Sequence, residues 1–102
     1  MTMKAEQLTL ALETAARQLG VVVRYETMTG ETAGAAGLCR IKGEWRVIMD
    51  KRTPTSDRVA ILAQALTQFD TESVFLPPEA RRAIEARAAA HPDGQAIPDP
   101  AA

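Results

Sequence analysis

Residues 53–70 read TPTSDRVAILAQALTQFD, and this stretch decides how the rest of the chain is arranged. Thr53 is a residue type that caps helix N-termini, and Pro54 fits the first helical position, where no amide proton is needed. Asp57 adds negative charge near the positive end of the helix dipole. The stretch therefore predicts a helix that begins at the Thr-Pro pair and ends at Asp70.

One side of this predicted helix is apolar. Its members recur at the spacing of a single helical face, and they are Val59, Leu62, Ala63, Leu66 and Phe69. Such a stripe has to be buried against a broad apolar surface. A β-sheet is the expected partner.

Three short segments before the helix predict that sheet. Residues 38–42 and 45–50 have strand character and are separated by Gly43-Glu44, which predicts an antiparallel hairpin because glycine accepts a positive φ. Residues 21–25, VVVRY, are rich in β-branched side chains and predict a third strand, buried on much of both faces.

Two more helices complete the prediction. Residues 3–19 have apolar side chains at helical spacing, and Gly20 follows as a C-cap. Residues 74–76 are predicted to dock on the core. The last helix follows them, ends near residue 90 and places Ala80, Ile84 and Ala88 on one side. The fold class is therefore α+β: a helix, a three-stranded mostly antiparallel sheet, a long core helix and a C-terminal helix.

Length and composition limit the organisation of the chain. Its 102 residues suit one domain, predicted over residues 1–91, and residues 92–102 carry three prolines and a glycine, which predicts a flexible tail. His91, at the end of the last helix, is interpreted as a C-terminal cap. The net charge of −1 gives no general attraction to nucleic acid or to anionic membranes.

The cysteine count and the hydropathy of the chain predict its compartment. Cys39 is the one cysteine, so no internal disulfide can form. No segment has the pattern of an export signal or the length of a membrane span. We expect a cytoplasmic protein with no membrane partner.

Residues 46–66 resemble the ImmA/IrrE family of zinc metallopeptidases, in which a strand leads through a Ser/Thr-Pro-like cap into the helix that carries the His-Glu-x-x-His metal motif. The segment LPPEA at residues 76–80 resembles the leucine-proline signature that follows the catalytic core of that family. The resemblance implies a minimal zincin-like core. The helix that would carry the third metal ligand is missing, because only about seven residues separate Phe69 from Pro77.

On this alignment the metal motif is degenerate. Gln64 and Gln68 occupy the two histidine positions, and Ala65 occupies the position of the glutamate base. A neutral amide oxygen is a poor zinc ligand, and alanine cannot accept a proton. The resemblance therefore implies a pseudoenzyme with no metal and no cofactor. The alternative interpretation is that the two glutamines are simply polar residues on the less buried side of an amphipathic helix.

The leading functional hypothesis is a non-catalytic protein-interaction or regulatory domain that binds another protein or itself as a dimer. The candidate surface comprises Gln64, Gln68, Arg81 and Arg82, next to an exposed sheet edge. Because ImmA/IrrE proteins cut repressors, the resemblance implies that a relic could hold a repressor without cutting it.

Two other classes of function stay open. A small enzyme would have to use Cys39 or a carboxylate such as Glu44 or Asp50, but no acid–base pair stands at a recognisable spacing. Weak nucleic-acid binding would have to use the arginines of the last helix, where acidic residues interrupt the basic patch and aromatic residues are missing. These arginines are Arg81, Arg82 and Arg87.

Overall fold

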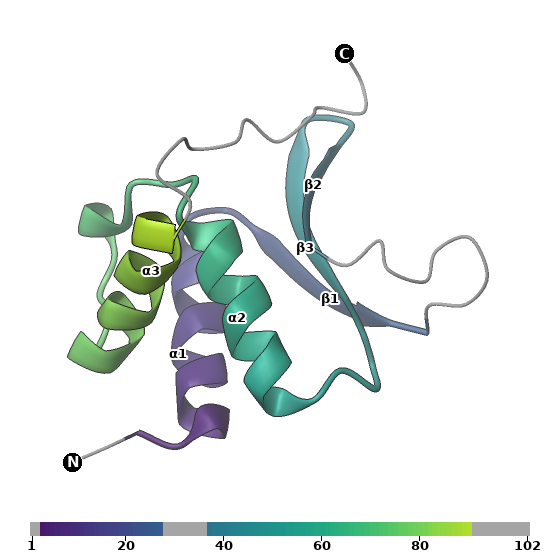
Figure 1. The fold of residues 1–102 in the computed structure, drawn as a ribbon. Coiled ribbons are helices and arrows are strands. Elements are labelled where there is room, and N and C mark those ends of the chain that lie inside the picture. The colour runs from purple at the N-terminus through teal and green to yellow at the C-terminus, as the bar shows by residue number, and fades with distance from the viewer. Residues whose placement is uncertain (1–2, 28–36, 91–102) are drawn as a thin grey trace.

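The computed structural model describes residues 3–27 and 37–90 (Figure 1). The elements follow in the order α1 (Ala5–Gln18), β1 (Val22–Glu26), β2 (Gly37–Ile41), β3 (Glu44–Asp50), α2 (Thr55–Leu66), the 3-10 turn η2 (Thr71–Ser73) and α3 (Pro78–Ala90). The α+β class and its sequence of helices and strands are confirmed. His91 and the predicted tail lie outside the described residues.

α2 is shorter than predicted at both ends. Pro54, and not Thr53, stands at the N-cap position, and its carbonyl accepts the first backbone hydrogen bonds of the helix, from Asp57 and Arg58 at 3.0 Å. The helix stops at Leu66 and not at Asp70. Asp70 instead caps the next turn, because its side chain accepts a hydrogen bond from the Glu72 amide at 3.0 Å.

The sheet has the strand order β1-β3-β2. β2 and β3 form the predicted antiparallel hairpin. The two turn residues are Lys42 and Gly43, and not Gly43 and Glu44. Their φ values of 51° and 81° are both positive, as in the hairpin turn whose twist matches the flanking strands.

β1 departs from the prediction in two respects. It pairs with β3 in parallel, so the sheet is mixed and not mostly antiparallel. It is also an outer strand, with Arg24 and Glu26 exposed, so the prediction that it is buried on both faces is wrong. Its valines reflect one-sided packing: Val23 contacts the core, and Val21, just before the strand, is almost fully buried.

The helices cover one face of the sheet. α1 and α2 pack against the sheet and each other, and α3 packs on them from the far side (Figure 1). Alternation along β3 turns Val47 and Met49 toward the helices, where both are fully buried. The remaining buried apolar residues are Leu12, Ala15, Ala16, Val21, Leu62, Ala63, Ala65, Leu66, Leu76, Ala80 and Ile84.

The segment before α3 docks on this core by Val74 and Leu76, as predicted, but not by Phe75. Leu76 is 5% exposed, but Phe75 next to it is 79% exposed. Consecutive residues of an extended segment point to opposite sides, so only one of the two can enter the core. The prediction that Phe75 docks is wrong, as is the inward placement of Ala88, which is exposed.

Candidate functional site

Gln64 and Gln68 have different surroundings. The Gln64 Oε1 atom accepts a hydrogen bond from the Arg87 Nε atom of α3 at 3.2 Å. Gln68 lies beyond the end of α2, is exposed, and donates from its amide to the Thr67 hydroxyl at 3.2 Å. Gln64 thus joins α2 to α3, whereas Gln68 faces solvent.

Ala65 lies inside the protein. It is 3% exposed and belongs to the core that α2 shares with its neighbours. A water-activating base has to reach a solvent-filled cleft, so this position suits an alanine and not a carboxylate. Within residues 3–27 and 37–90, no group of three or more His, Cys, Asp or Glu side chains could hold a metal ion.

The arginines of α3 have separate surroundings. Arg81 forms an ion pair with Glu72 at 3.2 Å, Arg82 is exposed, and Arg87 bonds to Gln64 at the other end of the helix. Gln64 therefore lies near Arg87 in the C-terminal half of α3, whereas Arg81 and Arg82 lie in its N-terminal half.

Cys39 lies in the middle of β2 on the sheet face that the helices do not cover, opposite Arg46 of β3. Partial burial raises the pKa of the Cys39 thiol, Arg46 lowers it and Glu26 raises it further. A raised pKa keeps the thiol protonated at neutral pH, and only the thiolate is a good nucleophile. The position does not activate Cys39 for catalysis.

The two carboxylates considered for catalysis are ion-paired to arginines. Glu44 accepts from the Arg46 Nε atom at 2.9 Å, and Asp50 contacts Arg52 at 3.1 Å. Both pairs lie on the sheet or directly after it and are partly exposed to solvent, where an ion pair contributes little free energy. Their geometry indicates a solvated charged surface.

Some backbone N–H and C=O groups of β1 point away from its neighbour β3. The Glu26 carbonyl accepts a hydrogen bond from the Lys51 amide of the adjoining chain at 3.0 Å, so it points toward β3. In a parallel pair successive residues turn their N–H and C=O groups to alternate sides. The N–H and C=O groups of Val23 and Tyr25 therefore point away from β3, toward the outer side.

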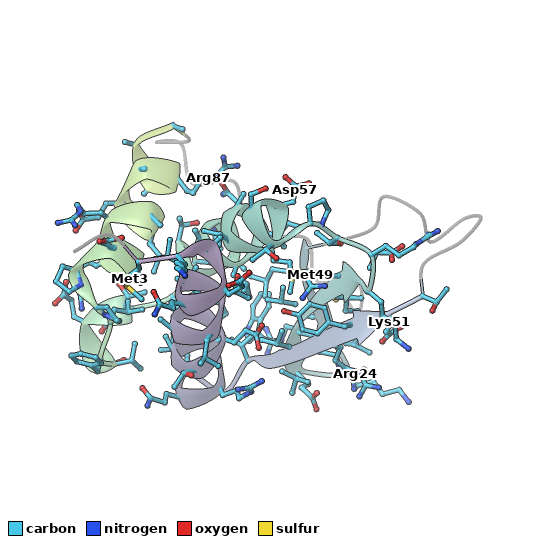
Figure 2. The ribbon with its side chains drawn as sticks, turned by 90° about the horizontal axis from the view of Figure 1, so that it is seen from below. Met3, Arg24, Met49, Lys51, Asp57 and Arg87 are labelled. Atoms are coloured by element: carbon cyan, nitrogen blue, oxygen red, sulfur yellow. The ribbon has the colours of Figure 1, made fainter. Side chains whose placement is uncertain are left out.

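The side chains of β1 differ between the two faces of the sheet. The uncovered face carries charged residues, and the other face packs on the helices. Arg24 and Glu26 lie on the uncovered side and form an ion pair at 3.5 Å. Figure 2 shows Arg24 on the side of the strand that faces away from the helices, whereas Met49 lies between β3 and α2.

Tyr25 attaches the same strand to the helices. Its hydroxyl donates a hydrogen bond to Glu13 of α1, and the Arg58 guanidinium of α2 lies 4.7 Å from the centre of its ring. Burial, followed by the hydrogen bond to Glu13, raises the pKa of Tyr25 to about 12. β1 is held on its helix side, and among residues 3–27 and 37–90 no strand pairs with its outer side.

Sequence reasoning named the sheet edge but missed the residues that form it. The useful signal was the opposite charge of Arg24 and Glu26 at a spacing of two, which places both on one face of a strand.

Comparison of the chain with protein-family models, with curated proteins and with solved structures finds no match. No helix within the described residues has both the length and the apolar character that a membrane crossing requires.

Proposed function

We propose that the chain is a non-catalytic protein-interaction domain that binds an extended segment along the outer side of β1. The observation that carries the proposal is the position of β1 at the edge of a sheet whose order is β1-β3-β2. Within the described residues this strand pairs on one side only, and the N–H and C=O groups of Val23 and Tyr25 face the other side. Added strands bind through such main-chain groups.

Three features of β1 support its use as a template. Tyr25 is fixed to α1 and α2, so the strand is ordered before it binds, which lowers the entropic cost of association. Arg24 and Glu26 are exposed and can select charges on an incoming strand. Charged side chains also protect an edge against unspecific pairing, so the partner has to match them.

The non-catalytic part of the proposal is supported by residues in α2 and in the turn that follows it. Gln64, Ala65 and Gln68 supply neither the imidazoles nor the carboxylate that zinc hydrolysis needs, and the three point in different directions. If the ImmA/IrrE resemblance reflects ancestry, a repressor segment is the kind of extended partner that it implies.

The test of edge binding uses a displayed library of random linear peptides selected on the purified protein. A selected peptide is then titrated into isotope-labelled protein, and we expect the amide signals of Val23 and Tyr25 to shift. The matched control is the same peptide with alternate backbone nitrogens methylated, which keeps the side chains but removes main-chain donors. Equal binding of the methylated peptide, shifts confined to α3, or a selection without enrichment would contradict the proposal.

The non-catalytic assignment has its own test. Elemental analysis of the purified protein and thermal unfolding with excess chelator measure whether a metal is held. We expect no stoichiometric zinc and an unchanged midpoint. One equivalent of zinc whose removal lowers the midpoint would overturn this assignment.

A further inference from the structure

The outer side of β1 has the charge pattern of a strand that pairs with a copy of itself. Arg24 and Glu26 are two residues apart on one face, and their side chains are 53% and 48% exposed. When two such strands run antiparallel about a two-fold axis, each arginine can stand opposite the glutamate of the other copy. A strand with this pattern is therefore self-complementary.

The backbone limits the registers that such a pair can adopt. Because the N–H and C=O groups of Val23 and Tyr25 face outward, the hydrogen bonds between two copies have to use these residues, together with Val21 or Thr27, which continue the same alternation. A register centred on Arg24 sets two arginines opposite each other, and one centred on Glu26 sets two glutamates opposite each other. Like charges in directly opposed positions are destabilising.

Only one of the remaining registers places opposite charges directly across from each other. A pair centred on Val23 would need the amide of Val21, which already donates to the Ala16 carbonyl at 2.9 Å. A pair centred on Tyr25 places Arg24 opposite Glu26 of the second copy, twice. These positions form the pairs without mutual hydrogen bonds, in which opposed side chains approach most closely.

The neighbouring strand favours a cation at the outer side of Glu26. Glu26 stands directly opposite Asp50 in the parallel pairing of β1 with β3. Two adjacent carboxylates repel each other, although Arg52 pairs with Asp50. In the register centred on Tyr25, Arg24 of the second copy arrives on the other side of Glu26 and offsets this repulsion.

An exposed apolar side chain lies on the helix that holds β1. Leu10 of α1 is 62% exposed. It shares a helical stripe with Glu13 and Arg17, at the spacings i, i+3 and i+7. Since Glu13 accepts the hydrogen bond from Tyr25, the stripe passes next to β1, and Leu10 is its exposed apolar member.

We propose that two copies of this chain pair through antiparallel β1 strands centred on Tyr25, with reciprocal ion pairs between Arg24 and Glu26. The pairing joins two sheets into one continuous sheet. This inference rests on the proposed binding at the β1 edge and identifies a second copy as its occupant.

The test is sedimentation analysis of the full chain over a wide range of concentrations, with single charge reversals. We expect the unchanged protein to dimerise reversibly, and R24E and E26R each to weaken the dimer by about tenfold or more, since each creates like-charge pairs. An equal mixture of R24E and E26R should dimerise again, because each strand then carries one sign of charge. The double variant R24E/E26R should also dimerise.

The control is E85R, which makes the same charge change as E26R at an exposed position of α3 and should leave the dimer unaltered. Circular dichroism checks that every variant keeps the fold. An unchanged protein that stays monomeric, single reversals without effect, or a mixture that fails to associate would each overturn the dimer. Peptide binding at the edge, measured separately by amide shifts, would survive these results.

Discussion

The helix α2 and the outer strand β1 differ in how far their side chains are buried. α2 has four buried residues in its twelve, whereas no residue of β1 is fully buried. Both elements are ordered by tertiary contacts, but α2 is enclosed by α1, α3 and the sheet, and β1 is held on one side only. The comparison teaches that, among the described residues, α2 contributes far more buried side chains to the core than β1, which pairs with a strand on one side only.

The largest effect should come from A65E, which places a carboxylate inside the enclosed helix α2. Ala65 is 3% exposed, so the new carboxylate would be buried without a partner and should destabilise the fold by about 3–5 kcal/mol. Urea unfolding followed by the fluorescence of Trp45, the single tryptophan, measures the change.

The matched control for A65E is Q64E. The new carboxylate would lie beside the Arg87 guanidinium, which already bonds to position 64, and should be tolerated. If A65E were as stable as Q64E, position 65 would reach solvent and the interpretation of α2 as a core helix would be wrong.

A smaller effect is expected from truncation, and it compares the two regions directly. L62A removes a fully buried side chain of α2 and should cost about 3 kcal/mol of the free energy of unfolding. V22A removes part of a half-buried side chain on the uncovered face of β1 and should cost about 1 kcal/mol or less. Equal losses in the two variants would contradict the difference between enclosed helix and open edge.

Tyr25 gives a third test, of the attachment of β1 to the helices. Y25F removes the hydrogen bond to Glu13 and should cost about 1 kcal/mol at neutral pH. Tyr25 is the single tyrosine, so ultraviolet absorbance follows its ionisation alone, and we expect a midpoint near 12 in the folded protein.

The same shift determines how stability changes with pH. The folded pKa of about 12 exceeds the ordinary value of 10.0, so the folded state holds the phenolic proton more tightly. The stabilisation is complete below pH 10 and is lost as the pH rises through 12. Y25F should lose less stability across this interval than the unchanged protein, and a midpoint at 10 in the folded protein would contradict the burial of Tyr25.

The sequence predicted the elements better than their partners. The hairpin, the three helices and the core positions Leu62, Ala63 and Leu66 follow from local spacing and turn chemistry, because these signals depend on neighbouring residues. The parallel pairing of β1 with β3 could not be predicted, since a run of valines suits an outer strand as well as a central one.

The candidate site shows the same limit. The sequence indicated that an edge would exist, but the register that places Glu26 opposite Asp50 arises from contacts between segments that lie far apart in the chain. The interpretation of Gln64 and Gln68 as a shared face assumed that α2 continues to Asp70. Because the helix ends at Leu66, the side chain of Gln68 does not lie on the same helical face as that of Gln64.

The smallest effect is expected at Phe75, where the enclosed half of the molecule meets solvent. Its side chain is 79% exposed, so F75S should change the free energy of unfolding by no more than about 0.5 kcal/mol. L76S, one residue later, replaces a side chain that is 5% exposed and should cost about 2 kcal/mol or more, because it leaves a cavity and buries a hydroxyl. Trp45 fluorescence during urea unfolding measures both variants. A large loss in F75S would mean that Phe75 packs on the core in solution. Phe75 would then have to be counted among the buried residues of the enclosed half.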